Sequence, residues 1–182
     1  MNISALEEFG LRCAVLLAEQ HPAGPISASR LAEREGLSVE YVSKLMHLFR
    51  KAGLVHANRG IQGGFQLARM PGEITILEVL DALKSKEKKS DQLSHLCARY
   101  KGQHAQCVRF GDCSVRPVWE TLLSYFSDVL RALSLQDLVD KERQARKRIE
   151  ILASSRADAI KQSLQRLKTD PVATPATKVS SL

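Results

Sequence analysis

Two short helices with strong start and stop signals, separated by one glycine turn, constrain this chain more than any other feature. Ser27 is a good N-cap for the first helix, and Gly36 is placed to end it. Two residues later, Ser38 can cap a second helix, Val39–Ala52, which Gly53 closes in the same way. A helix, a glycine turn and a second capped helix are the pattern of a helix-turn-helix, so we expect one here.

A β-hairpin is expected directly after this second helix. Leu54–Asn58 and Phe65–Ala68 have the character of short strands, and the glycine-rich segment Arg59–Gly64 separates them. Further on, Thr75-Ile-Leu-Glu78 is a capping box that opens another helix. The expected fold is therefore mainly α: a winged helix-turn-helix over residues 1–83, with a small β-hairpin as its wing and a long C-terminal dimerisation helix.

The distribution of charge is more informative than the net charge of +7. Between residues 141 and 168 there are nine lysines and arginines against three acids, which leaves residues 1–140 close to neutral. The stretch from Tyr41 to Arg69, however, contains five basic residues and no acid. Local positive potential attracts phosphate, so this stretch is the first candidate for a surface that faces DNA.

The chain carries no signal for a membrane or for secretion. No apolar run approaches the ~20 residues that a membrane span needs. Glu7 and Glu8 stand where a secretory signal would carry basic residues. We therefore expect a cytoplasmic protein, in which cysteines are more often free thiols or metal ligands than disulfides.

The residues expected to read DNA lie at the start of the second helix and at the tip of the wing. A recognition helix reaches base edges in the major groove mainly with the side chains of its first turns. A basic residue at a glycine-rich wing tip can enter a narrow minor groove. The alternative is an ordinary helical bundle with a solvated basic face. The candidates are Ser38, Glu40, Tyr41, Ser43, Lys44, Arg50, Arg59, Gly60, Gln62 and Gly63.

The C-terminal half is expected to contain a dimerisation helix. Ser114 and Pro117 are helix-start signals, and a near-heptad apolar stripe follows them. A stripe of this length exposes more apolar surface than a small winged domain can cover, so we expect a homodimer that binds a palindromic operator in double-stranded DNA. We assign 84–117 to a linker and cysteine loop, 118–140 to the dimerisation region, 141–168 to a basic helical tail and 169–182 to disorder. The stripe consists of Trp119, Leu122, Leu123, Phe126, Val129, Leu130 and Leu133.

One run of the sequence extends from the turn before the second helix to the end of the wing: Gly36-Leu-Ser-x-x-Tyr41…Leu45…Arg50-Lys-x-Gly53-Leu-Val55…Arg59-Gly60-x-x-Gly63-Gly64-Phe65-x-Leu67. This run resembles the IscR/NsrR-type regulators, and the resemblance extends over roughly residues 1–140. Helix 1 (Glu8-Phe9-Gly10-Leu11-Arg12), Trp119 and Ser134-Leu-x-x-Leu138-Val139 also have equivalents in the family. The resemblance implies a dimeric winged-helix repressor or activator of transcription, and many members of this group hold an iron–sulfur cluster.

Three cysteines form the candidate metal site. Their spacing, Cys97-x9-Cys107-x5-Cys113, lacks the C-x2-C pairs of zinc ribbons. Iron–sulfur clusters are held mainly by thiolates. The family pattern is C-x5-C-x5-C, so the second interval matches and the first is four residues longer. The resemblance implies a [2Fe-2S] or [4Fe-4S] cluster on these thiolates, and one family subtype completes the ligand set with an acid from helix 1 of the partner subunit, where this chain has Glu8.

Other interpretations of the cysteines stay open. The thiols could form a cluster-free switch that responds to oxidation, or the regulator could respond to a small ligand. His95 and His104 are possible substitute ligands, whereas Cys13 lies on an apolar helical stripe and is expected in the core. We find no catalytic triad order, phosphate-binding loop, dinucleotide fingerprint or CxxC motif, so no enzymatic activity is expected.

Overall fold

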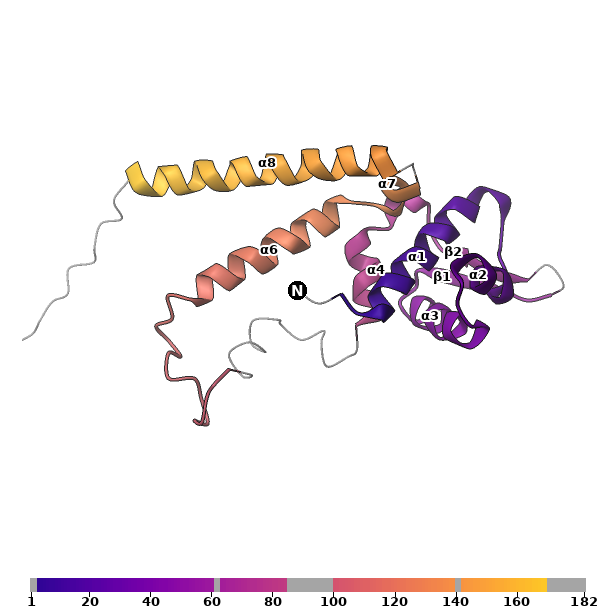
Figure 1. Cartoon of the computed structure of the whole chain (residues 1–182), viewed down its shortest axis with the longest axis horizontal. Coiled ribbons are helices and arrows are strands. Elements are labelled where there is room, and N and C mark those ends of the chain that lie inside the picture. Colours follow the sequence, from indigo (N-terminus) through magenta and orange to yellow (C-terminus); the bar gives the residue numbers. More distant parts are fainter. Residues whose placement is uncertain (1–2, 61–62, 85–99, 140–141, 170–182) are drawn as a thin grey trace, which may run out of the picture.

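The computed structural model describes residues 3–60, 63–84, 100–139 and 142–169, and these residues form a mainly helical protein with one two-stranded sheet. Figure 1 shows a compact N-terminal part, from which two long helices, α6 and α8, extend. In chain order the elements are α1 (Ala5–Gln20), η1 (His21–Ala23), α2 (Ala28–Glu35), α3 (Val39–Lys51), β1 (Val55–Asn58), β2 (Gly64–Leu67), η2 (Pro71–Glu73), α4 (Ile76–Leu83), α6 (Arg116–Ala132), α7 (Leu135–Val139) and α8 (Glu142–Thr169).

The expected helix-turn-helix is confirmed, and its caps are those that the sequence indicated. The Ser27 hydroxyl accepts a hydrogen bond from the Arg30 amide at 3.2 Å, and the Ser38 hydroxyl accepts one from the Tyr41 amide at 3.2 Å. Gly36 ends α2 in the left-handed conformation, with φ of +66°. Because only glycine adopts this conformation without a steric cost, Gly36 allows the sharp turn into α3.

The wing is an antiparallel hairpin in which Val55 pairs with Leu67 and Asn58 with Gly64. Its first strand begins one residue later than expected, because the Leu54 amide donates to the Phe49 carbonyl at 2.9 Å and closes α3. Its second strand spans Gly64–Leu67 rather than the expected Phe65–Ala68. Ile26, just before α2, exchanges two backbone hydrogen bonds with Phe65, at 3.0 and 2.8 Å. The hairpin is therefore anchored to the helix-turn-helix.

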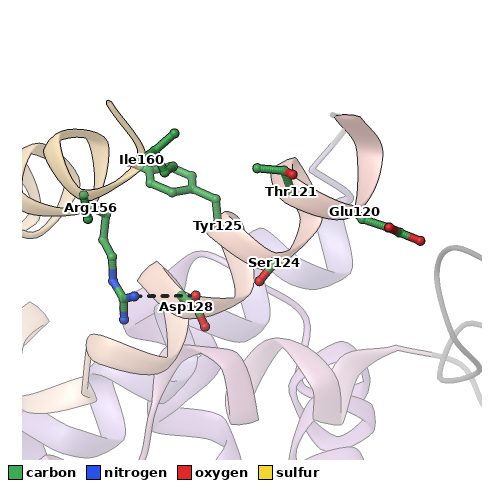
Figure 2. Close-up of a pocket in the computed structure, with 8 residues that line it drawn as sticks. Glu120, Thr121, Ser124, Tyr125, Asp128, Arg156 and Ile160 are labelled. Atoms are coloured by element: carbon green, nitrogen blue, oxygen red, sulfur yellow. Dashed lines mark ion pairs between the residues drawn. The ribbon is translucent and has the colours of Figure 1, made fainter. Parts of the chain in front are cut away.

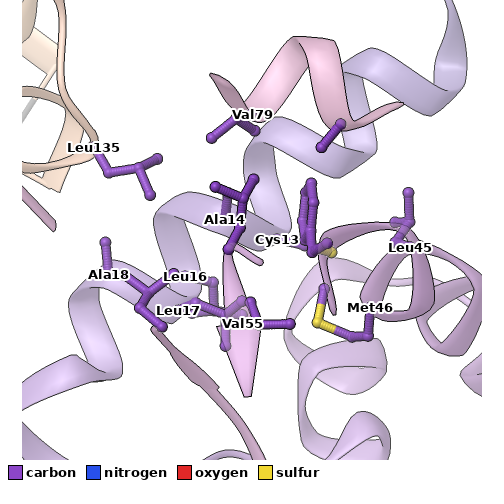
Figure 3. Close-up of a cluster of buried hydrophobic side chains, with 14 of the residues drawn as sticks. Cys13, Ala14, Leu16, Leu17, Ala18, Leu45, Met46, Val55, Val79 and Leu135 are labelled. Carbon is purple, nitrogen blue, oxygen red and sulfur yellow. The ribbon is translucent and has the colours of Figure 1, made fainter. Parts of the chain in front are cut away.

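One hydrophobic core joins the N-terminal helices to the segment around α7. Cys13, Ala14 and Leu17 from α1 pack with residues of α3, α4 and the wing (Figure 3). Leu135 of α7 is fully buried in the same cluster, and its amide donates to the Ile74 carbonyl at 2.9 Å. The core of the winged domain thus contains residues from well beyond position 83.

The two long helices differ from the rest in their burial. α6 begins after Val115, with Pro117 in its first turn, and contains no fully buried residue. Ser114 is therefore not its cap. α8 continues as a helix to Thr169, close to the expected end at residue 168, while residues 170–182, expected to be disordered, lie outside the described residues. No helix among the described residues is long and apolar enough to cross a membrane.

Replacing Gly10 with alanine is expected to destabilise the fold. A Cβ atom at Gly10 would collide with the Leu83 side chain, where α1 crosses α4. Glycine to alanine normally stabilises a helix, so a loss of about 1–3 kcal/mol in the free energy of unfolding would report this overpacking. Urea denaturation measures it. Gly72→Ala is the matched control, since its Cβ would lie 4.0 Å from the nearest atom. Equal free energies of unfolding for the two variants would contradict the close packing of Gly10 against Leu83.

Candidate functional site

The first turns of α3 present polar side chains on one face and core residues on the other. Glu40, Ser43 and Lys44 are exposed, and so is Arg50 at the far end of the helix. The opposite face is buried and consists of Val42, Leu45, Met46 and Phe49. The helix is therefore packed against the core through its apolar face, and its polar face is accessible to a ligand.

Ser38 affects the ionisation of Glu40 at the start of α3. The backbone amide of Glu40 and, to a smaller extent, the Ser38 hydroxyl hold the pKa of the Glu40 carboxyl below its ordinary value. Glu40 is therefore a hydrogen-bond acceptor at neutral pH and cannot donate. An ionised acid at this position suits a cytosine amine and repels phosphate.

Tyr41, one of the candidates for reading DNA, packs against α1. Its side chain is half-buried, and its ring packs edge-on against Phe9 of α1, with the centroids 6.0 Å apart. The Arg12 guanidinium lies over the Phe9 ring, 5.6 Å from its centroid. The Tyr41 ring therefore links α3 to α1, a role that the sequence did not indicate because Phe9 is far away along the chain.

The wing tip carries an exposed Arg59 on a tight turn. Gly60 has φ of +113°, and the Gly63 amide donates to the Gly60 carbonyl at 2.8 Å. A side chain at Gly63 would also collide with the backbone of Asn58. Both glycines are thus required by the turn itself, whatever they contact on DNA. Gln62, the other wing candidate, lies outside the described residues.

One basic residue of the acid-free stretch Tyr41–Arg69, Arg69, forms an ion pair with an acid from outside the stretch. The Arg69 guanidinium lies 2.7 Å from the Glu78 carboxylate and donates to the Glu73 carbonyl at 3.0 Å. Glu78 lies just beyond the stretch in sequence, so inspection of the stretch alone overestimates its charge. Among the described residues, Lys44, Arg50, Lys51 and Arg59 make no ion pair, and they supply the positive charge of this surface.

The cysteine loop lies before α6 and carries two partly exposed thiols, Cys107 and Cys113. The Cys107 carbonyl accepts from the Phe110 amide at 3.0 Å, and the Cys113 carbonyl accepts from the Arg116 amide at 3.2 Å. Each cysteine thus belongs to a compact turn, in which its residue is partly exposed. Cys97 and His95 lie outside the described residues. The part of the chain that is described contains no group of three or more His, Cys, Asp or Glu side chains that could hold a metal ion. Neither Glu8 nor His104 therefore forms such a group with these two thiols within one chain.

Glu8 is exposed on α1 and lines a groove of about 370 Å³ between α1, α2 and α7. Two ion pairs border this groove: Arg12 with Glu35 at 2.7 Å and Arg34 with Glu19 at 3.2 Å. Leu11, Val15 and Leu138 provide apolar surface in the groove. Glu8 is therefore an accessible carboxylate beside an apolar depression.

Cys13 is a core residue, as expected. Its side chain is fully buried, and burial, followed by the nearby Glu35 carboxylate, raises its pKa to about 11. The Cys13 thiol therefore stays protonated at neutral pH. Because its side chain is enclosed by the apolar core, Cys13 is not accessible to a metal ion or cluster.

Part of the apolar stripe on α6 is open to solvent. Trp119, Leu122 and Phe126 are 46%, 44% and 43% exposed, although large apolar side chains are normally buried. Val108 and Phe110 of the cysteine loop are also exposed. Trp119 is thus not in the core of the single chain, and this surface is available to a partner.

Known proteins resemble this chain in sequence and in fold. Residues 3–141 match the family model described as Rrf2, iron-dependent transcriptional regulator. The regulator IscR of Aliivibrio salmonicida is 30% identical over 145 residues, which are 79% of this chain and 81% of that protein.

Two solved structures are similar to this one. The structure of T. potens IscR has a TM-score of 0.60 at 29% identity, covering 76% of this chain and 86% of that one. CymR, described as the global cysteine regulator of B. subtilis, has a TM-score of 0.60 at 27% identity, covering 76% and 96%. The confirmed helix-turn-helix and wing and the match over most of the sequence lead to one conclusion: this chain belongs to the Rrf2 family of winged-helix, DNA-binding transcriptional regulators.

Proposed function

We propose that the chain is a homodimeric regulator that reads a palindromic operator with α3 in the major groove and the wing in the minor groove. The observation that carries the proposal is the exposed face of α3 next to the unpaired cations Lys44, Arg50 and Arg59. Lys44 can donate to guanine or phosphate, and ionised Glu40 can accept from cytosine. Ser38, Ser43, Gly60, Gln62 and Gly63 complete the proposed contact surface, and Tyr41 contributes through its hydroxyl while its ring anchors α3.

The apolar stripe of α6 is the proposed dimer interface. Trp119, Leu122 and Phe126 recur at three- and four-residue spacing and are each more than two-fifths exposed. Two copies that pair through this stripe would bury these side chains and place two α3 helices on one duplex, as a two-fold operator requires. The free thiols fit a reducing, cytoplasmic setting.

The regulatory ligand of the proposed function is an iron–sulfur cluster. Cys97, Cys107 and Cys113 would supply thiolates, and Glu8 of the partner subunit would supply the fourth ligand. The accessibility of Cys107 and Cys113 and the position of Glu8 on an open surface support this ligand set. When bound, the cluster would provide metal–ligand bonds that order the loop and that respond to oxidants or nitric oxide.

A cluster-free regulator is the second candidate, and the similarity to CymR favours it. That relative is described as a cysteine regulator. Cys107 and Cys113 are accessible thiols in one loop, so oxidation of this pair, or a small ligand in place of a cluster, could also alter operator binding. Iron analysis of the purified protein distinguishes the two candidates.

Lys44→Ala and Arg59→Ala test the proposed DNA surface. Each is expected to weaken binding to a duplex that the wild-type chain selects from a random library by about 5- to 100-fold, because each loses a charged contact to a base or a phosphate. Fluorescence anisotropy at several salt concentrations measures the affinity, and loss of a phosphate contact lowers the salt slope by about one. Lys161→Ala removes the same charge from α8, where Lys161 lies 3.4 Å from Asp158, and serves as the control. Equal affinities in all three variants would refute the assignment of this surface.

A further inference from the structure

The tail helix α8 lies beyond the end of the family match at residue 141, so the proposed function leaves its 28 residues unexplained. Its charge suggests contact with DNA. In Figure 1, however, α8 runs along the upper edge of the molecule, whereas α3 lies at the lower edge of the winged domain, with α1 and α4 between them. Within one chain, α8 therefore stands on the opposite side of the winged domain from the recognition helix.

The first contact of α8 is with α7. The Arg148 guanidinium lies 2.9 Å from the Asp137 carboxylate. The same carboxylate accepts from the amide and the hydroxyl of Ser134, at 2.9 and 2.7 Å, at the start of α7. Burial raises the pKa of Asp137, but the Ser134 hydrogen bonds and Arg148 outweigh this and leave it below its ordinary value. Because Leu135 of α7 lies in the core, Arg148 links α8 to the winged domain.

The second contact of α8 is with α6. The Tyr125 hydroxyl donates to the Ala153 carbonyl at 3.1 Å, and the Arg156 guanidinium lies 3.7 Å from the Asp128 carboxylate. Figure 2 shows Arg156 reaching from α8 to Asp128, and the Tyr125 ring directed towards Ile160. These residues border an open groove of about 550 Å³ between the two helices. α8 is thus joined to α6 by side chains that the apolar stripe does not use.

The charge of α8 is partly engaged by these contacts. Arg148 and Arg156 bind acids of α7 and α6, and Arg146 pairs with Glu142 within α8 at 2.8 Å. Trp119, Leu122 and Phe126 remain exposed although α8 is in place. The helix therefore contacts a different face of α6 and leaves the proposed dimer stripe open.

We propose that α8 is a brace that fixes the direction of α6 relative to the winged domain and that it does not extend the DNA-contact surface. Through Tyr125 and Asp128 it links the half of α6 nearer to the winged domain to α7, which is itself part of the domain core. Its effect on DNA rests on the proposed function, because the direction of α6 would determine how far apart two α3 helices stand in a dimer. A change in that spacing alters the fit at both half-sites together.

Charge reversal in the full-length protein tests the brace. Arg156→Asp places a second carboxylate beside Asp128 and is expected to increase amide hydrogen exchange in α6 by about three- to tenfold in DNA-free protein. Adding Asp128→Lys reverses the pair and should restore part of the slow exchange; the restoration is incomplete because it also removes the ion pair of Asp128 with Arg131 at 3.3 Å. Lys147→Asp makes the same charge change at an exposed position of α8 outside these contacts and should leave α6 unchanged. Tyr125→Phe, which removes only the hydrogen bond to Ala153, is a milder second variant with the same expected direction.

Operator binding then separates a brace from a phosphate contact. With the selected duplex, the brace predicts weaker binding for Arg156→Asp, unchanged binding for Lys147→Asp and the same salt slope for both. Equal losses of affinity and of salt slope in both variants would show direct contact with DNA and overturn the proposal. Unchanged exchange of α6 in both Arg156→Asp and Tyr125→Phe would also overturn it. If the wild-type chain selects no duplex, the proposed function fails, but the exchange measurement still decides the role of α8.

Discussion

Protein purified without oxygen is expected to lose its iron, its acid-labile sulfide and its visible absorbance when Cys107 and Cys113 are both replaced with serine. A serine hydroxyl does not ionise at neutral pH and is a poor ligand for iron, whereas thiolates hold these clusters. Losing two of the three proposed thiolates should therefore reduce iron to background. Metal analysis and absorption spectra of the reconstituted proteins measure this result.

Cys13→Ala is the matched control for this experiment. Cys13 is fully buried and its pKa is about 11, so its replacement should leave the iron content at the wild-type value. Glu8→Gln should retain the thiolate-bound cluster while changing its spectrum, because the fourth ligand is altered. A wild-type chain that binds no iron after reconstitution would refute the cluster and support the cluster-free regulator.

Phe49→Ala is expected to lower the free energy of unfolding by about 3–5 kcal/mol. Phe49 is 1% exposed on the core face of α3, so truncation removes a large apolar side chain and leaves a cavity behind the recognition helix. Such a loss is a large fraction of the stability of a small domain. Urea denaturation followed by circular dichroism measures it.

Val39→Ala provides the comparison on the same helix. Val39 is 42% exposed, and its replacement should change the free energy of unfolding by no more than about 0.5 kcal/mol. Comparable losses in the two variants would mean that α3 is not packed through the face described here. Because α3 is held from its core face, we also expect Phe49→Ala to weaken DNA binding without removing any contact to DNA.

Local chemistry explains what could be predicted without the structure. Ser27, Gly36 and Ser38 determine the helix-turn-helix through hydrogen bonds and backbone angles that span four residues or fewer. The burial of Val42 and Leu45 follows from helical periodicity, and the burial of Cys13 follows from its place on an apolar stripe. These interactions depend on near neighbours in sequence, so the sequence alone indicates them.

Other parts of the candidate site depend on residues that are distant in sequence. Tyr41 links α3 to α1 because its ring packs against Phe9. Arg69 contributes less positive charge to the surface around α3 and the wing because it forms an ion pair with Glu78. Neither Phe9 nor Glu78 could be predicted as a contact from the sequence around Tyr41 or Arg69. Glu8 likewise forms no group with Cys107 and Cys113 among the described residues.

The sequence by itself determined the winged helix-turn-helix and the position of its second helix, because caps, glycine turns and apolar periodicity act over short distances. Its resemblance to known regulators indicated the family. Only the tertiary structure decided which basic residues remain available to DNA, that Leu135 completes the core of the winged domain, and that α8 binds α6 and α7. Those outcomes depend on which side chains approach one another when the helices pack, and that approach brings together residues separated by tens of positions.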